Sequence, residues 1–129
     1  IAVSKRLGCI GHAISKHAKN YGFGVVTRYG GHGLEWNKPH APPFVANKGE
    51  VDSEIRIQEG LAIAIEPMLT IGSPETWTAN DGWTVLTNNI GAHAEHSIFV
   101  HRDSVEIVTW RENEKYLKSN RIYFNQETA

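Results

Sequence analysis

Three residues from well-separated parts of the chain, His32, Glu66 and Glu95, are of the types that hold a divalent metal ion. His32 lies among the glycines of residues 30–33. Glycine lets the backbone bend sharply and expose an imidazole. Taken alone, this pattern is more typical of a turn histidine in solvent than of a ligand, so the case for a metal depends on the two glutamates.

Glu66 follows the apolar run at residues 61–65 and precedes Pro67. A strand that is apolar on both faces is normally buried, and a carboxylate at its end then needs a partner or a metal ion. Proline stops the hydrogen-bond ladder directly after it. The alternative is a glutamate at a strand end that pairs with a surface lysine. The pattern favours a metal-binding or catalytic role over that alternative.

Glu95 lies within residues 92–100, which read as another strand. Because side chains alternate along a strand, His93, Glu95 and Ser97 are expected on one face and His96 on the other. A polar edge strand is the alternative. The apolar continuation of the segment favours a buried central strand and a ligand role for Glu95.

One imidazole and two carboxylates form a hard site that suits Co, Mn, Fe(II) or Zn. Such an ion acidifies bound water, which makes the water a nucleophile near neutral pH, so a metallohydrolase is one interpretation. A second interpretation comes from another class of enzyme. His93 and Glu95 with a distant histidine imitate the two-histidine, one-carboxylate triad of non-haem Fe(II) oxygenases. The residues alone leave both interpretations open.

The elements that must position these residues begin with an amphipathic helix, expected over residues 1–21 and ended by Gly22. A strand is expected at residues 23–27, and then a long irregular stretch at 29–50, rich in glycine and proline; long loops inside compact domains are often functional. Asp81-Gly82 predicts a hairpin, and the tail after Trp110 predicts a short helix or disorder. Further strands are expected at residues 54–57, 61–67, 76–78, 83–87, 93–101 and 105–109. This pattern indicates an α+β fold, with an antiparallel or mixed sheet and helices on one side.

Composition excludes several function classes. The net charge of −1 predicts no nucleic-acid or membrane partner, and no apolar run approaches the ~20 residues of a membrane helix. The single cysteine, Cys9, excludes an internal disulfide and fits a reducing, cytoplasmic location. The chain begins at Ile1 and its only methionine is Met68, so we expect that further residues precede it.

Four motifs occur in the order and spacing of the type I methionine aminopeptidases, which this chain resembles over roughly residues 8–110. His32 and Glu66 are 34 positions apart, and Glu66 and Glu95 are 29 apart. Four ordered motifs are a far stronger signal than any one of them. The motifs are Gly31-His32-Gly33, Ile65-Glu66-Pro67-Met68, Asp81-Gly82-Trp83-Thr84-Val85 and Glu95-His96-Ser97.

The resemblance implies the pita-bread fold, in which two α+β halves enclose a site for two metal ions. It implies removal of the N-terminal methionine from nascent proteins whose second residue is small. Residues 1–129 would be the C-terminal portion of that catalytic domain. By carry-over, His32 resembles a metal ligand, Glu66 a ligand that also transfers protons, and Glu95 the ligand that bridges both ions. Trp83 resembles the tryptophan that walls the methionine pocket.

The chain departs from the family pattern in two places. His40 resembles the histidine that binds substrate and polarises the scissile carbonyl, but its spacer is about one residue longer, and Pro39 replaces the usual aromatic residue. The family's two aspartate ligands and a second substrate histidine are expected upstream of the chain, since Asp52, Asp81 and Asp103 match neither motif nor spacing. We therefore expect at most one ion here, and completion of the site by a missing N-terminal half or by self-association.

Two other interpretations remain within the same superfamily. A relative without peptidase activity would act as a peptide-binding module, although such a module would not need His32, Glu66 and Glu95 together. A proline-specific peptidase is the other interpretation. The segment at residues 81–85 favours the methionine branch over it.

Overall fold

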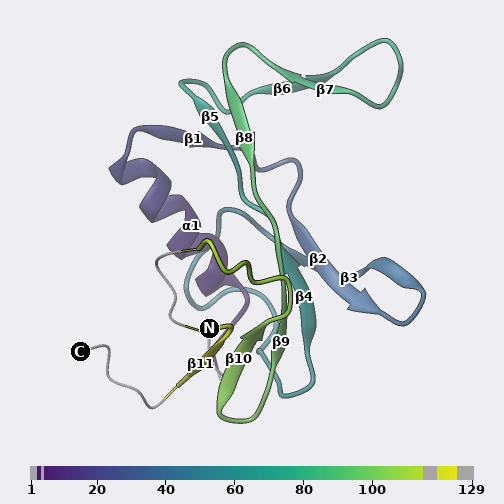
Figure 1. Cartoon of the computed structure of the whole chain (residues 1–129). Helices are drawn as coiled ribbons and strands as arrows, with labels where there is room; N and C mark the ends of the chain where they lie inside the picture. The colour runs from purple at the N-terminus through teal and green to yellow at the C-terminus, as the bar shows by residue number, and fades with distance from the viewer. Residues whose placement is uncertain (1–2, 4, 115–118, 125–129) are drawn as a thin grey trace.

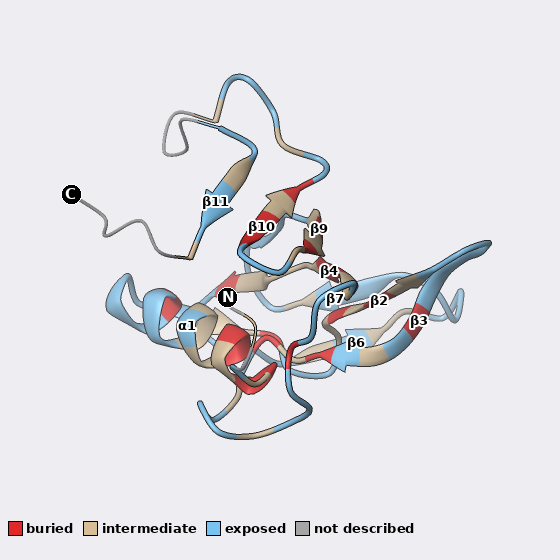
Figure 2. Cartoon of the chain, turned by 90° about the horizontal axis from the view of Figure 1, so that it is seen from below, coloured by how far each residue is buried: buried red, intermediate tan, exposed pale blue. Residues whose placement is uncertain are grey.

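The structure, a computed structural model, describes residues 3, 5–114 and 119–124. In that part of the chain a single helix, α1 (Gly8–Asn20), lies beside three antiparallel sheets (Figure 1). The helix and the strands of the largest sheet share one apolar core. Buried residues of α1, β4, β9 and β10 contribute to it (Figure 2), and the core includes Leu7, Ile10, Ile63, Ile98 and Val100.

Helix α1 is shorter than the predicted helix at residues 1–21. Before it, Leu7 donates its N–H to the Ile55 carbonyl at 3.0 Å, and Arg6 forms an isolated bridge with Arg56. These non-helical pairings replace the first turns of the predicted helix, of which residues 1, 2 and 4 lie outside the described part. The predicted stop is confirmed, because Gly22 has a φ of 75°.

The largest sheet contains six strands in the order β11-β10-β9-β4-β2-β3, and all neighbours in it are antiparallel. It places β4 at the centre, between β2 and β9. The apolar run predicted to be a buried strand is therefore a central strand, and Ile63 in it is fully buried. The strands are β2 (Gly31–Glu35), β3 (Lys38–Val45), β4 (Ala62–Ile65), β9 (His96–Val100), β10 (Ser104–Ile107) and β11 (Arg121–Tyr123).

A second sheet has three strands in the order β1-β5-β8, and a separate hairpin joins β6 to β7. The bounds are β1 (Phe23–Val25), β5 (Met68–Ile71), β6 (Thr76–Thr78), β7 (Val85–Thr87) and β8 (Gly91–His93). The hairpin predicted from Asp81-Gly82 is confirmed, since Ala79 donates its N–H to the Thr84 carbonyl at the turn, at 2.8 Å.

Four sequence-based predictions of local structure are wrong. Much of the stretch at 29–50 is the β2–β3 hairpin rather than a loop, and residues 54–57 form only the Arg56 bridge. The strand expected at 93–101 is two strands, interrupted at Ala94 and Glu95. The tail contributes β11, neither helix nor disorder in its described part, while residues 115–118 and 125–129 lie outside that part.

The glycines that indicated a loop instead permit close strand packing. A Cβ on Gly31 would overlap the Ala64 carbonyl oxygen of β4, and one on Gly33 would overlap the Pro42 carbonyl oxygen of β3. Only glycine lets β2 lie so near both of its neighbours. His32 is thereby held in a central part of the sheet rather than in a flexible turn.

No helix in residues 3, 5–114 and 119–124 has the length and apolar character needed to cross a membrane.

Candidate metal centre

The two glutamates lie where the chain passes from one sheet to the other. Glu66 lies between β4 and β5, and Glu95 lies between β8 and β9. Strand β4 pairs with β9, with Ile65 opposite His96, and β5 pairs with β8, with Met68 opposite His93. The two crossings therefore run side by side (Figure 1), which brings residues 29 positions apart together.

The Glu66 carboxylate lies between two imidazoles. Its Oε1 is 3.6 Å from His32 Nε2, and its Oε2 is 3.1 Å from His93 Nε2. His32 reaches it from β2, where it stands opposite Ala64 of β4. The side chain of Glu66 is only 13% exposed. A nearly buried carboxylate needs a charged partner, hydrogen-bond donors or a metal ion, and imidazole and carboxylate are both ligands that divalent ions accept.

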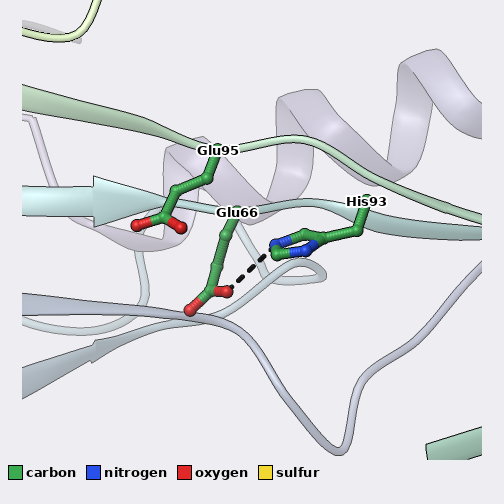
Figure 3. Close-up of side chains that lie close together, drawn as sticks. All are labelled: Glu66, His93 and Glu95. Carbon is green, nitrogen blue, oxygen red and sulfur yellow. Dashed lines mark hydrogen bonds and ion pairs between the residues drawn. The ribbon is translucent and has the colours of Figure 1, made fainter.

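Glu95 completes a compact group with Glu66 and His93. One ligand atom from each of the three lies within 4.8 Å of the others. Figure 3 shows both carboxylates and the imidazole of His93 around a shared space. Ligands of a tetrahedral ion bonded at ~2.0–2.2 Å lie about 3.4 Å apart, so small side-chain movements would let this group share an ion.

His93 was not assigned as a ligand on the metallohydrolase interpretation and entered only the iron-oxygenase alternative. The signal that could have identified it is its two-residue spacing from Glu95. The sequence predicts one continuous strand over these residues, whereas β8 ends at His93 and Glu95 lies in the short segment between β8 and β9.

His40 lies beside His32. Their ring centroids are 4.4 Å apart with the planes at 58°, because the β2–β3 hairpin places the two histidines on adjacent strands. His32, His40 and Glu66 line an open pocket of about 600 Å³. Its other walls come from residues near the strand ends, among them Tyr29, Phe44, Met68, Trp83 and Val85.

Trp83 reaches this pocket from the β6–β7 turn and is 88% exposed. Asp81 orders the turn, since its Oδ1 accepts the N–H of Trp83 and the N–H of Thr84, each at 2.9 Å. Its Oδ2 accepts the Thr84 hydroxyl at 2.5 Å. The bonds from the Thr84 hydroxyl and then from the two backbone N–H groups lower the pKa of Asp81. The Trp83 ring is therefore exposed to solvent, while its backbone is held by the hydrogen bond to Asp81.

His96 lies outside the cluster. Its Nδ1 is 3.0 Å from Thr109 Oγ1, and its Nε2 is 3.0 Å from Glu114 Oε1. Since His96 opens β9 directly after Glu95, these contacts fix the backbone beside Glu95 and leave the His96 ring away from Glu66.

Comparison with known families identifies the class of protein. The profile of metallopeptidase family M24 matches residues 2–102. The chain belongs to metallopeptidase family M24. Its relatives include the methionine aminopeptidase of Aquifex aeolicus, 43% identical over 109 residues, a match that covers 81% of this chain and 42% of that protein.

Solved structures give the same result for the fold. A methionine aminopeptidase from Thermotoga maritima superposes with a TM-score of 0.82 at 33% identity, over 86% of this chain and 45% of that one. One from Rickettsia prowazekii gives 0.81 at 34% identity, over 85% and 45%. The predicted α+β, pita-bread arrangement is confirmed. The chain spans less than half the length of these relatives.

Membership of an M24 metallopeptidase family implies use of divalent metal ions, and the donor set of this chain fits such ions. Two carboxylates and two imidazoles offer the oxygen and nitrogen donors that Zn, Co, Mn and Fe(II) accept. Among the described residues, neither Glu66 nor Glu95 forms an ion pair with a lysine or arginine. A divalent cation would therefore not have to displace an existing positive partner from either glutamate.

Proposed function

We propose that residues 1–129 are the C-terminal portion of a methionine aminopeptidase, which removes the N-terminal methionine from nascent proteins with a small second residue. The observation that carries the proposal is Glu66, nearly buried and flanked by His32, with Glu95 close by. This geometry occurs in an M24 chain that is 43% identical to a methionine aminopeptidase. Family membership also favours a hydrolase over the oxygenase alternative.

His32, Glu66 and Glu95 would be the metal ligands in this proposal. The ions are Co, Mn, Fe(II) or Zn, two in the complete enzyme and at most one in this chain. A bound divalent ion supplies Lewis-acid chemistry and makes water a stronger acid. Glu66 also carries a proton between the attacking water and the leaving amine, which its low exposure favours because little bulk water competes.

The pocket beside the cluster would receive the N-terminal methionine. His40, against His32, would donate a hydrogen bond to the scissile carbonyl oxygen and thereby polarise it. Trp83, with the other apolar groups that line the pocket, would wall the methionine side chain. The longer spacer before His40 spans the tip of the β2–β3 hairpin, where Asn37 has a φ of 56°, and the pairing of the two strands shifts register between Gly33 and Glu35.

The remaining parts of the site would come from elsewhere. Two aspartate ligands and a second substrate histidine are expected from an upstream N-terminal half, or from self-association of the chain. The substrates would be N-termini of nascent polypeptides, with neither nucleic acid nor membrane as a partner. The cytoplasm is the proposed location.

The test joins this chain to the upstream portion of the Aquifex aeolicus methionine aminopeptidase and measures release of methionine from a Met-Ala-Ser peptide. The joined enzyme should be active, the isolated chain inactive. Glu66→Gln in the joined enzyme should abolish turnover while circular dichroism stays unchanged, because the replacement is nearly isosteric. Glu35→Gln on the exposed hairpin tip is the control and should retain activity. Full turnover by Glu66→Gln would refute the proposed role.

A further inference from the structure

We propose that His93 is a metal ligand, so that this chain can hold one divalent ion through four side chains: His32, Glu66, His93 and Glu95. The proposal rests on the metal site proposed above and adds a ligand to it. It also changes the expectation for the isolated chain. Four donors from one chain form a complete coordination set for a tetrahedral ion.

The first argument is the distance between donors. His93 Nε2 lies 3.1 Å from Glu66 Oε2, and His32 Nε2 lies 3.6 Å from Glu66 Oε1. Adjacent ligands of one ion lie about 3 Å apart in octahedral geometry and about 3.4 Å apart in tetrahedral geometry at bonds of ~2.0–2.2 Å. Both separations fall close to these values. The two imidazoles approach different oxygens of the same carboxylate, so both ring nitrogens lie beside the Glu66 side chain that would ligate the ion.

The second argument is how the backbone fixes His93. It ends β8 opposite Met68 of β5, and Met68 is only two residues beyond Glu66. The next residue, Ala94, donates its N–H to the Pro67 carbonyl at 3.4 Å. The backbones that carry His93 and Glu66 are therefore tied together directly beside the cluster. Preorganisation of this kind raises metal affinity, because less chain entropy is lost on binding.

The third argument is charge. Ligand atoms of Glu66 and Glu95 lie within 4.8 Å of each other, where two like charges repel. The arginine that lines the small pocket beside them, Arg111, already pairs with Glu114 at 2.8 Å. One divalent ion would balance the two carboxylate charges. A second ion would have no further carboxylate, which is why one ion is expected.

The fourth argument is what else His93 could do. Its side chain is 48% exposed, so it adds little to the core, and an exposed ion pair stabilises a fold by about 0–1 kcal/mol. The alternative role is a hydrogen bond that only orients Glu66. Two variants separate the roles. His93→Gln keeps a hydrogen-bond donor but removes the imidazole, whereas His93→Ala removes both.

The experiment titrates the 129-residue chain with Zn(II) in a calorimeter and counts imidazole ligands by X-ray absorption of the zinc-loaded protein. One ion per chain and two imidazoles are expected. His93→Gln and His93→Ala should each bind at least about tenfold more weakly, and His93→Gln should show one imidazole. The matched control is His101→Gln, which removes another histidine–glutamate pair, His101 Nε2 to Glu106 Oε2 at 2.9 Å. It should bind zinc like the unmodified chain.

Three outcomes would overturn the proposal. If His93→Gln binds zinc as tightly as the unmodified chain, with an unchanged imidazole count, His93 is no ligand, and the site of His32, Glu66 and Glu95 stands. If only His93→Ala weakens binding, His93 merely orients Glu66. If the unmodified chain binds no zinc, the four-ligand site fails, whereas the proposed function, which needs the upstream half, is tested separately by the joined enzyme.

Discussion

Gly33→Ala tests whether close strand packing holds His32 in place. Gly33 lies in β2 between β3 and β4, opposite Ala41 and Ile63. A Cβ there would overlap the Pro42 carbonyl oxygen, and backbone cannot yield as a flexible side chain can. Strands β2 and β3 must therefore separate, and the adjacent His32 must move with them.

The expected loss follows from this overlap. Forcing one methyl group into packed structure costs about 1–3 kcal/mol. We expect a loss of unfolding free energy near the upper end of that range, because the obstacle is backbone. For a domain of this size, such a loss corresponds to a fall in melting temperature of roughly 8–12 °C. Displacement of His32 should also weaken Zn(II) binding. Thermal unfolding followed by circular dichroism measures the first effect, and calorimetric titration measures the second.

Gly91→Ala is the matched control for this prediction. Gly91 also lies in a strand of the same fold, but its Cβ would meet the Thr87 methyl group at 3.5 Å and the Leu69 carbonyl oxygen at 3.7 Å, which are ordinary contacts. This variant should be neutral, or more stable by up to about 1 kcal/mol. If Gly33→Ala matched it in melting temperature and in zinc affinity, the role assigned to the glycines beside His32 would be wrong.

Four further predictions follow from the core, the site and the β6–β7 turn. Ile63→Ala removes a fully buried side chain from β4 and should lower the free energy of unfolding by about 2–5 kcal/mol in urea; a loss below 1 kcal/mol would contradict its place in the core. Zinc at 100 times its dissociation constant should raise the free energy of unfolding by about 2.7 kcal/mol, and a chelator should reverse the gain. Asp81→Ala should increase hydrogen exchange at the Trp83 and Thr84 amides, with Asp81→Asn intermediate; unchanged rates would show that the turn does not depend on this carboxylate. The pKa of Asp81 is lowered in the folded state, so its contribution to stability is present at pH values above the unfolded pKa near 3.8. That contribution is lost as the pH falls through the lower folded-state pKa. An NMR titration of the Asp81 carboxyl group that shows an ordinary or raised pKa would refute this.

Features that depend on local sequence were predicted well. The apolar run before Glu66 is a central strand, β4. It could be predicted because a strand buried on both faces is apolar at every position, and the sequence shows this directly. Asp81-Gly82 marks the β6–β7 hairpin because the turn chemistry is local; β6 matches the predicted strand at residues 76–78, and β7 is shorter than the strand predicted at 83–87. The side chains of His32 and Glu66, which the resemblance implies are both metal ligands, lie 3.6 Å apart, and their ligand role stays a proposal.

Features that depend on tertiary packing were missed. Gly31 and Gly33 read as loop residues because their lack of a side chain is compatible with a turn, whereas the structure needs them for strands that nearly touch. The strand β3 contains Pro39, Pro42 and Pro43, which argued against a strand. It forms the edge of the six-stranded sheet, where proline is tolerated because no further strand needs its N–H. The residue types of this segment do not reveal that it lies at the edge of the sheet.

The position of Glu95 shows why the alternation of side chains could point to this residue as a candidate ligand but could not predict where its side chain lies. An unbroken strand would put His93 and Glu95 on one face simply by alternation. Instead β8 ends at His93 in the three-stranded sheet, and β9 begins at His96 in the six-stranded sheet. The segment that carries Glu66, between β4 and β5, runs beside the segment that carries Glu95, between β8 and β9. Residues 94 and 95 and residues 66 and 67 lie outside the named strands, so their side chains need not alternate between the two faces of a sheet, and both carboxylates can lie together. The metal site is thus assembled by the junction of two sheets, a feature that arises only when both strand pairs have formed.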